Sequence, residues 1–558
     1  MIELITDMNV VSKLLNCSVP NKFLSVSLNY DGYRTVAPKI IKSGQQSTLL
    51  TRHIEQGNVE AMQDIDKTLP KDLPVVYYNP YFLFEPACTP VFGEFIDAFT
   101  SVAGTEKQVQ VHKDLPLSIY QWMSMNYEIE IYEKEIADPG FYVYEFSRAD
   151  VIKRFAVGRA EADSAALKLI EKSPIKKRLE YYIKERTDTR FSVLDGLMKA
   201  NGVDAILCTS PLGIQEITGF GMERHIDDMF AAYYEIESDK VQLFSVEPLE
   251  DFGQGRKVST FGAAIKDQVN NGILGLEEQH FPLGWFRGLG FDKIKTVNAM
   301  NLVRLLREKT GSENLSYCII ATRASVFATD ESLAWAKKEI LGSKSITELD
   351  IYEKYLDLLK KFQKDNNIPI NINTFWTNCH SSKRSIIPSL PFNHQLDESA
   401  RAIKIDAGVS LRGETGIHYA ASDIARTIIF DDEVQKAYNK FEDYMVRNVI
   451  PNIKPGMSGK DIHELAVTQI EKERYFFENI GMIPAGNLNE TFNRDVGHLV
   501  GLQEPVTMFF TKNTGMKVDE GMIGALEYQW SYKGFGIGVE DLFVIESEGG
   551  LNYSRDGL

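Results

Sequence analysis

Two residues in the last third of the chain combine acidic side chains with an apolar strand-like setting. Asp406 and Asp423 lie in "IKIDAGVSLRGETGIHYAASDIARTI", which alternates in polarity on both sides of a glycine-containing turn. Such alternation predicts a pair of strands joined by a hairpin. Two carboxylates in an apolar strand pair are costly to bury unless a cation lies between them. The segment therefore raises the hypothesis of a metal centre whose remaining ligands come from elsewhere in the chain.

Three further segments carry candidate ligands in similar surroundings. His498 lies in "DVGHLVGLQEP", Glu527 ends an apolar and glycine run in "GMIGALEYQW", and Glu540 lies in the alternating "FGIGVEDLFVIE", where Asp541 points to the opposite face. Taken singly, each acid also fits an ordinary strand-end carboxylate, and His498 fits a buried core histidine. Taken together, four carboxylates and one imidazole are enough to hold two divalent ions that polarise a substrate carbonyl. Oxygen-rich ligands without a thiolate favour Mn, Fe or Co ahead of Zn.

The elements that must position these residues follow from periodicity. After residue 400 strands dominate, interrupted by the helix "DDEVQKAYNKFEDYMVRNVI" and by the helix "SGKDIHELAVTQIEKERYFFE", for which Ser458 is the expected N-cap. Two long helical patterns precede them, "ASVFATDESLAWAKKEIL" and "TELDIYEKYLDLLKKFQKDNN". Upstream, helices alternate with strands such as "VDAILCTS" and with a hairpin that turns at residues 237–240, which predicts an α/β unit over about residues 185–310.

Composition limits the classes of function. A chain of 558 residues with 44% apolar and 25% charged residues is globular and long enough for two or three domains. Its net charge of −17 argues against binding nucleic acid or an anionic membrane. Five scattered cysteines indicate a reducing compartment, and neither a signal peptide nor a membrane-spanning run is recognisable. We expect a cytoplasmic protein.

The order of the C-terminal segments resembles the catalytic domain of the pita-bread family of creatinase, prolidase, aminopeptidase P and methionine aminopeptidase. The similarity runs from "IKIDAG" through "SDIARTIIF", "GHLVGL" and "EGMIGALE" to "GIGVEDLFVIESEGG". It implies an α+β fold and two divalent metal ions. The metal-ligand positions that it implies are Asp406, Asp423, His498, Glu527 and Glu540.

Upstream, "VLDGLMKANGVDAILCTSPLGIQEITGF" resembles the start of the family's N-terminal domain. The resemblance divides the chain into a creatinase-N-like α/β domain over 181–340 and a pita-bread catalytic domain over 341–558. Residues 1–180 stay unassigned, with a diverged second creatinase-N-like domain as the analogy. Because the family usually dimerises through its N-terminal domains, we expect a homodimer.

The sequence departs from the family at two positions. Peptidases of this family carry two further histidines near the metals. The ungapped alignment of "FWTNCHSSKRSIIPS" places Ser389 at the first of these positions, and Pro505 in "GHLVGLQEP" stands at the second. Loss of one pre-organised donor to an oxyanion typically costs on the order of 100- to 1,000-fold in rate. The substitutes that we consider are two residues of a lengthened hairpin and two histidines upstream of it: Glu414, His418, His394 and His380.

Three of these candidates also fit ordinary surroundings. Glu414 and His418 fit a solvated hairpin tip equally well, and the pair Cys379 and His380 is more often incidental than a metal site. Arg426, which matches an arginine common in the family, is expected to pair with the ligand carboxylates.

Three functions remain open. The first is a hydrolase that uses a metal-bound hydroxide on a peptide or amide bond of a small peptide or amino-acid derivative, with Glu527 as proton acceptor and His418 and Arg426 as further catalytic residues. The second is iron- and oxygen-dependent oxidative or lyase chemistry on a small amino-acid-like substrate. The third is a binding protein that has lost catalysis, for which the retained ligands are unexpected. We expect a small-molecule or short-peptide substrate, and neither nucleic acid nor a membrane as a partner.

Overall fold

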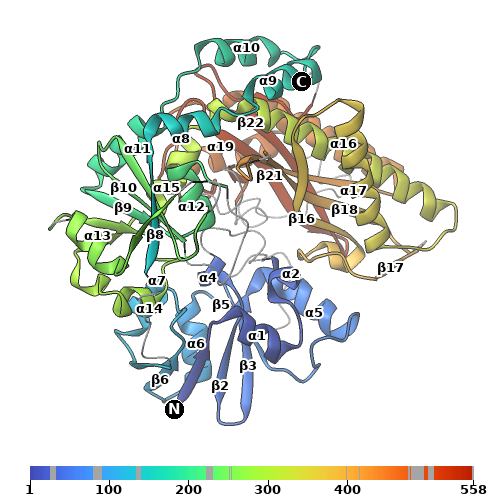
Figure 1. The fold of residues 1–558 in the computed structure, drawn as a ribbon. Coiled ribbons are helices and arrows are strands. Elements are labelled where there is room, and N and C mark those ends of the chain that lie inside the picture. The colour runs from blue at the N-terminus through green and yellow to red at the C-terminus, as the bar shows by residue number, and fades with distance from the viewer. Residues whose placement is uncertain are drawn as a thin grey trace.

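A computed structural model describes residues 1–24, 33–79, 91–132, 140–221, 230–249, 252, 254–269, 271–397, 399–413, 415–474, 478, 495–500 and 508–555. Three units follow one another along the chain (Figure 1). The N-terminal unit lies at the bottom of the view in blue, the second at the left in green, and the C-terminal unit at the upper right in yellow to red. Each unit is built around its own sheet or pair of sheets.

The N-terminal unit is a seven-stranded mixed sheet in the order β5-β4-β3-β2-β1-β6-β7. Its strands β1 and β6 are parallel neighbours, whereas β2 runs antiparallel to both β1 and β3. The strands are β1 (Ile2–Ile5), β2 (Lys39–Ser43), β3 (Gln46–Arg52), β4 (Val75–Tyr78), β5 (Val91–Phe92), β6 (Gln108–Val111) and β7 (Glu128–Ile131). The helices are α1 (Met8–Leu15), α2 (Val19–Lys22), α4 (Tyr33–Val36), α5 (Gln56–Asp64), α6 (Phe95–Ala103) and α7 (Leu117–Met123).

The second unit is another seven-stranded mixed sheet, in the order β12-β8-β11-β10-β9-β13-β14. Its strands are β8 (Phe141–Ser147), β9 (Ala205–Cys208), β10 (Phe230–Glu235), β11 (Lys240–Ser245), β12 (Arg256–Val258), β13 (Leu274–Leu276) and β14 (Thr296–Asn298). Its helices are α8 (Arg148–Phe155), α9 (Arg159–Leu169), α10 (Lys176–Glu185), α11 (Arg190–Ala200), α12 (Pro211–Thr218), α13 (Phe261–Val269), α14 (Leu283–Gly288) and α15 (Met300–Lys309).

The C-terminal unit holds a three-stranded sheet, β16-β18-β19, and a four-stranded sheet, β20-β21-β22-β23. Its strands are β15 (Ile346–Thr347), β16 (Asn371–Ser381), β17 (Gln395–Leu396), β18 (Ala402–Arg412), β19 (His418–Ile429), β20 (Gly497–Leu499), β21 (Ile523–Tyr532), β22 (Phe535–Val544) and β23 (Leu551–Asn552). Its helices are α16 (Leu315–Leu341), α17 (Glu348–Asp365), α18 (Asp432–Asn448) and α19 (Gly459–Lys472). Short 3₁₀ turns cover His53–Glu55, Phe291–Lys293, Gly311–Asn314, Ser382–Ser385 and Ile450–Asn452.

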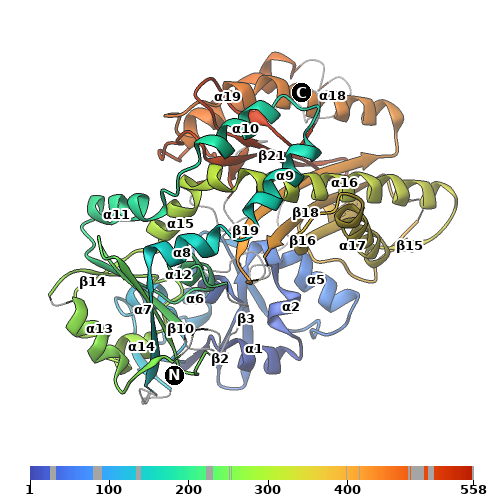
Figure 2. The same cartoon turned by 45° about the horizontal axis from the view of Figure 1, so that its top comes forward.

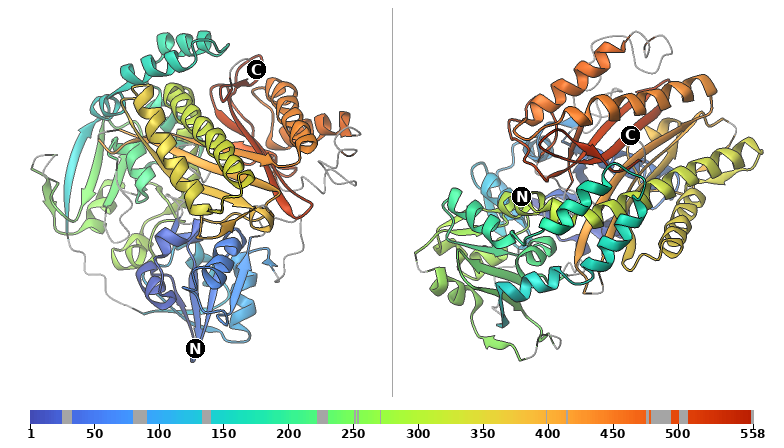
Figure 3. Two further views of the ribbon diagram at one scale, coloured as in Figure 1. Left: turned by 90° about the vertical axis from the view of Figure 1, so that its right-hand side faces the viewer. Right: turned by 90° about the horizontal axis from the view of Figure 1, so that it is seen from above.

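Helices cover the outer faces of these two sheets. The long helix α16 packs against β18 and β19, and α17 packs against β16. Apolar residues of α18, α19, β21 and β22 form a second core. Figures 2 and 3 show the yellow-green α16 and yellow α17 on one side of the strands and the orange α18 and α19 on the other. The inner faces of the two sheets are therefore turned toward each other, with β22 next to β19.

The helix starts follow the expected capping chemistry. The Ser458 side chain accepts a hydrogen bond from the backbone N–H of Asp461, and the Asp461 carboxylate in turn accepts from Ser458, so Ser458 is the N-cap of α19 as predicted. Thr347 and Asp350 form the same reciprocal box at the start of α17. The predicted hairpin at residues 237–240 joins the antiparallel strands β10 and β11.

The strand pairing places one segment differently from the sequence analysis. Strand β8, which falls within the predicted first unit of residues 1–180, pairs with β11 and β12 in the second sheet. The two sheets thus part between Ile131 and Phe141 rather than near residue 180. A long helical run, α8 to α11, separates β8 from the rest of its sheet, which hides the pairing in the linear sequence. Every helix in the part of the chain that the structure describes is too short or too polar to span a lipid bilayer.

Candidate metal centre

Asp406 and Asp423 lie on one face of neighbouring strands. In the antiparallel register of β18 and β19, Asp406 is opposite Ala425, and Gly408 is opposite Asp423. Directly opposed residues point to the same face, as do residues two apart. The two carboxylates are therefore diagonal neighbours rather than a directly opposed pair. The other face carries residues such as Ile405 that are buried in the core under α16, so both acids project toward the second sheet.

The second sheet presents the other three candidate ligands on one face. Glu527 of β21 is directly opposite Glu540 of β22. His498 of β20 is opposite Ala525, which lies two residues before Glu527. The strand pleat therefore directs His498, Glu527 and Glu540 to the same side.

The imidazole of His498 is the point at which the two sheets meet. Its Nε2 atom lies 3.7 Å from Asp423 Oδ2, 3.6 Å from Glu540 Oε1 and 3.9 Å from Glu527 Oε2. Its Nδ1 atom lies 3.0 Å from the carbonyl oxygen of Leu499. Because a carbonyl only accepts, Nδ1 is the donor in this contact, and in the neutral imidazole this leaves the Nε2 lone pair directed at the carboxylates.

Asp406 joins the group through an amide. The Gln529 Nε2 atom donates to Asp406 Oδ2 at 2.7 Å and to Glu527 Oε1 at 2.6 Å. The Gln529 Oε1 atom accepts from Lys404 Nζ at 2.9 Å. A buried lysine thus orients the glutamine, and the glutamine holds one carboxylate from each sheet.

Burial and charge make the group suited to cations. The residues Asp406, His498, Glu527 and Glu540 are 7% exposed or less, and the Asp423 side chain is 15% exposed. Four clustered carboxylates, three of them buried, repel one another unless cations compensate them. Two donor atoms that share an ion at about 2.1 Å lie about 3.4 Å apart in tetrahedral geometry, close to the separations around His498. The donor set therefore fits divalent ions.

Arg426 is not where the sequence analysis placed it. Its guanidinium donates to Asp541 Oδ1 at 2.8 Å and lies 3.7 Å from Glu442, instead of pairing with the candidate ligand carboxylates. Arg426 lies three residues from Asp423, an odd offset that turns its side chain to the outer face. Asp541 faces the same way because it follows Glu540 on β22. The pair supports the strands from outside.

His418 lies apart from the candidate ligands. It is five residues from Asp423 on β19, about 16 Å along an extended strand. Its side chain lines a cavity of about 20 Å³ together with Arg190 and Glu216 of the second unit. Its backbone N–H donates to Gln215 at 2.7 Å, and its carbonyl accepts from the same side chain at 2.9 Å. The hairpin end that carries His418 is buried against α12 rather than solvated.

Ser389 and His380 occupy a closed cluster. Both are fully buried, and Ser389 Oγ lies 3.1 Å from His380 Nε2. The same Nε2 atom donates to the Ser389 carbonyl at 2.6 Å, and Nδ1 lies 2.9 Å from Glu348 Oε1. Arg384 donates to both carboxylate oxygens of Glu348 and to Ser389 Oγ. His380 thus lies next to Ser389, the position at which the family carries a histidine. Its ring nitrogens, however, contact Glu348 and Ser389.

The other positions considered in the sequence analysis, Glu414, Pro505 and His394, add no described side chain to the group around His498. Glu414 and Pro505 lie outside the described residues. His394 is half-buried before β17, where its carbonyl accepts from the backbone N–H of Glu348. The sequence analysis did not single out Lys404 or Gln529. Each lies two residues from a candidate ligand on an alternating strand. The period of two along a strand could therefore have indicated that both side chains share the face of the ligands.

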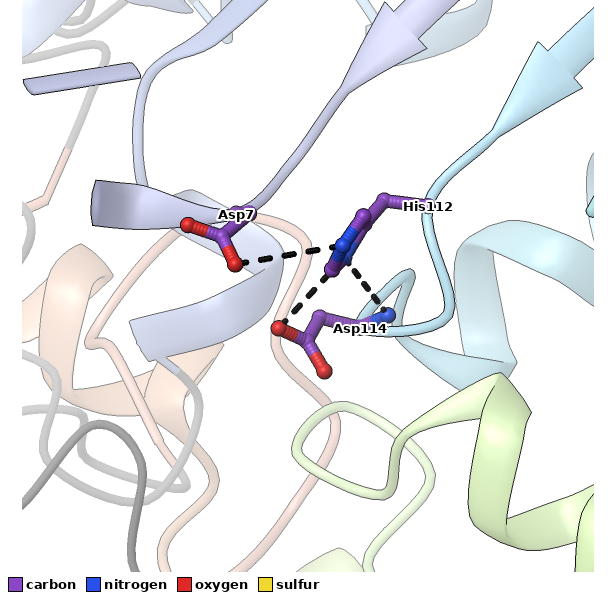
Figure 4. A group of neighbouring side chains, drawn as sticks. All are labelled: Asp7, His112 and Asp114. Carbon is purple, nitrogen blue, oxygen red and sulfur yellow. Dashed lines mark hydrogen bonds and ion pairs between the residues drawn. The ribbon is translucent and has the colours of Figure 1, made fainter. Parts of the chain in front are cut away.

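A second group of possible ligands lies in the N-terminal unit, where β1 and β6 end (Figure 4). The His112 Nε2 atom lies 3.9 Å from Asp7 Oδ2, and Nδ1 lies 3.5 Å from Asp114 Oδ2. The Nδ1 atom also accepts from the backbone N–H of Asp114 at 3.3 Å. Burial alone would raise the pKa of Asp114, but His112 and Arg34 lower it. Because the two carboxylates approach different ring nitrogens and Nδ1 already accepts from a backbone N–H, the arrangement is that of a hydrogen-bonded histidine between two acids.

Comparison with known proteins covers the part of the chain that carries the five candidate ligands around His498. Residues 320–547 match the model of metallopeptidase family M24. An Xaa-Pro dipeptidase from Pseudoalteromonas atlantica is 28% identical over 228 residues, 39% of this chain and 47% of that protein. One from Shewanella amazonensis is 28% identical over 165 residues, 29% of this chain and 35% of that protein. The chain thus spans less than half the length of these curated relatives.

Two solved structures share the fold. The X-prolyl aminopeptidase from Caenorhabditis elegans, described as a cytosolic enzyme with a di-nuclear active site, has a TM-score of 0.57 at 12% identity, covering 99% of this chain and 86% of its own. An Xaa-Pro dipeptidase from Bacillus anthracis has a TM-score of 0.50 at 16% identity, covering 66% of this chain and 97% of its own. These likenesses show the fold: a pita-bread domain preceded by two α/β units. The match to the model of metallopeptidase family M24 is confined to residues 320–547.

Proposed function

We propose that the chain is a dinuclear-metal hydrolase that cleaves a peptide or amide bond of a short peptide or amino-acid derivative. The observation that carries the proposal is the meeting of the two sheets at His498, whose Nε2 faces three carboxylates at 3.6–3.9 Å. The match to a metallopeptidase family and the likeness to Xaa-Pro dipeptidases support the reaction class. The residues that would hold two divalent ions are Asp406, Asp423, His498, Glu527 and Glu540.

The chain's own residues would divide the work as follows. When bound, the ions supply Lewis-acid polarisation of the substrate carbonyl and activation of water. Glu527 is the group best placed to hold the proton that the water gives up, because Gln529 fixes its Oε1 and leaves Oε2 toward His498. Lys404 orients Gln529. His418 and Arg426 have no part in this proposal, because their side chains lie beside Arg190 and Glu216, and beside Asp541, respectively.

A second candidate rests on the cluster around Ser389. A peptidase of this family would place a histidine there, whereas Ser389 is fully buried and bonded to His380 and Arg384. Oxidative or lyase chemistry at an iron centre, on a small amino-acid-like substrate, needs no such donor. The metal separates the two candidates: we propose Mn or Co, or else Zn, for the hydrolase, and Fe for the second candidate.

The test uses the full chain purified without chelators. It is supplied with Mn²⁺, Co²⁺, Zn²⁺ or, anaerobically, Fe²⁺, and incubated with a panel of Xaa-Pro dipeptides, other dipeptides and amino-acid amides. The hydrolase predicts release of free amino acids that stops with EDTA and with Glu540→Gln. Metal-loaded protein that hydrolyses nothing in the panel, but consumes oxygen with Fe²⁺ and an amino-acid-like substrate, would favour the second candidate.

Assembly and location are part of the proposal. We propose a cytoplasmic homodimer, from the sparse cysteines and from the usual assembly of the family that the chain resembles. Among the described residues Cys17, Cys208, Cys318 and Cys379 form no disulfide. Burial raises the pKa of the Cys208 and Cys379 thiols, with the neighbouring carboxylates adding to the effect, which disfavours the reactive thiolate form of both. Analytical ultracentrifugation of the purified chain measures the oligomeric state.

A further inference from the structure

One buried polar side chain beside the metal centre has no partner in the described chain. Asn378 of β16 is 0% exposed, and neither its Oδ1 nor its Nδ2 atom has a hydrogen-bond partner among the described residues. Buried amides without partners are rare, because the lost hydrogen bonds to water are not replaced. A buried amide without partners is expected where the protein binds a ligand or an ion.

The strand register places Asn378 directly at the candidate centre. Asn378 is opposite Asp406 in the antiparallel pair of β16 and β18. Directly opposed side chains share a face, with their Cβ atoms about 4.5–5.5 Å apart. Asp406 in turn shares that face with Asp423 across β19. Asn378, Asp406 and Asp423 therefore form a diagonal row across three strands.

The polar side chains around Asn378 and Asp406, from both sheets, already have partners. Gln529 uses its amide nitrogen for Asp406 and Glu527, and its oxygen accepts from Lys404. His380, two residues beyond Asn378, is bonded to Ser389. In the row of Asn378, Asp406 and Asp423, it is therefore the Asn378 amide whose hydrogen-bonding atoms are not used by contacts among the described residues. Those atoms are available to bind a ligand.

We propose that the side-chain carbonyl oxygen of Asn378 is a further ligand of the ion held by Asp406. The inference rests on the proposed dinuclear centre and extends it by one neutral oxygen donor. A carbonyl oxygen suits a hard ion of high coordination number, whereas Zn²⁺ favours four ligands with nitrogen and sulfur among them. Asn378 therefore biases the site beside Asp406 toward Mn²⁺ over Zn²⁺.

The strand offers a matched control. Cys379 is the next residue, is equally buried, and faces the opposite side, where its Sγ lies 3.3 Å from the carbonyl oxygen of Glu348. Cys379→Ser changes the same strand at the same depth on the side away from the metal. Asn378→Leu removes the amide while keeping the volume, and Asn378→Asp keeps an oxygen at the same place.

Titration calorimetry with MnCl₂ and with ZnCl₂, on the metal-free full chain, tests the proposal. We expect Asn378→Leu to weaken binding of one Mn²⁺ per chain by about 10- to 100-fold, the range seen when groups that support metal ligands are removed. Zn²⁺ binding should change by less than about threefold, because Zn²⁺ reaches its usual four ligands without this oxygen. Asn378→Asp should bind Mn²⁺ at least as tightly as wild type, and Cys379→Ser should match wild type.

A second readout guards against a folding defect. Because the amide lacks partners in the described chain without metal, the metal-free Asn378→Leu variant should have a Tm equal to or above that of the metal-free wild type. Wild-type Mn²⁺ affinity in Asn378→Leu would overturn this proposal and leave the dinuclear centre standing. A wild-type chain that binds no Mn²⁺, Co²⁺ or Zn²⁺ would overturn both.

Discussion

The adjacent acids Glu540 and Asp541 on β22 provide an internal comparison, because the account gives them opposite roles. Glu540 lies 3.6 Å from His498 Nε2 on the inner face. Asp541 accepts from Arg426 at 2.8 Å and from Arg555 at 2.8 and 3.0 Å on the outer face. Burial alone would raise the pKa of Asp541, but the two arginines lower it, so the carboxylate is charged. Changing each acid to its amide separates metal binding from stability.

The loss of stability expected in Asp541→Asn follows from the burial of its ion pair. Asp541 is 1% exposed and the Arg426 side chain 7%, and removing one partner of a buried ion pair typically costs about 3–5 kcal/mol. Because the amide in Asp541→Asn keeps one accepting oxygen, we expect the lower end, about 3 kcal/mol. For a domain of this size that corresponds to a fall in Tm of about 6–12 °C. Glu540→Gln removes one of four clustered carboxylates, so the metal-free chain should be as stable as wild type or more stable.

The assay combines urea unfolding in EDTA with metal analysis of the reloaded proteins. Asp541→Asn should unfold at lower urea yet bind as much metal as wild type below its transition. Glu540→Gln should unfold at the wild-type or a higher urea concentration and bind at most one ion per chain. Equal loss of metal in both variants, with unchanged stability of Asp541→Asn, would refute the assignment of faces on β22.

Three further outcomes are expected. Burial alone would raise the pKa of Glu348, but His380 and Arg384 lower it to about 2. A lowered pKa stabilises the fold above the unfolded value near 4.3. That contribution of about 3 kcal/mol to the free energy of unfolding should be lost as the pH falls from about 5 toward 2. In Glu348→Gln, the urea midpoint of unfolding should therefore depend less on pH in this range. The same pH dependence in the variant as in wild type would exclude the ion-pair explanation. Gly221→Ala would place a Cβ 2.0 Å from a backbone carbon at the tip of the β18–β19 hairpin; we expect faster proteolysis between the second and third units, and wild-type resistance would contradict the contact. Gln529→Ala should weaken metal binding about 10- to 100-fold by freeing two carboxylates, and calorimetry with MnCl₂ showing wild-type affinity would argue against its positioning role.

The C-terminal fold was predictable because its signals are local. Alternation around Asp406 and Asp423 defines a hairpin, and the capping box at Ser458 defines a helix start. The period of two also places each candidate ligand on a face once the strands are known. The same rule, applied to Arg426, puts it on the face opposite to that of Asp423, where the structure has it. That error came from matching a family position without following the pleat.

Other features depend on contacts between segments that are distant in the sequence. The periodicity of a single segment carries no information about such contacts. The cluster of His380 with Ser389 forms because β16 ends and the chain folds back, so that two residues nine positions apart meet. Strand β8 joins a sheet whose next strand in sequence lies beyond several helices. The availability of Asn378 becomes visible only when the partners of the neighbouring polar groups are known.

The central claim is that the five convergent side chains hold a pair of divalent ions. The most direct measurement is the number of metal atoms per chain, by elemental analysis of protein purified without chelators and dialysed against metal-free buffer. The account predicts about two per chain in the wild type, at most one in Asp423→Asn, and about two in Asp541→Asn. A wild-type chain that retains no ions even after reconstitution with Mn²⁺, Co²⁺, Zn²⁺ and Fe²⁺ would contradict it.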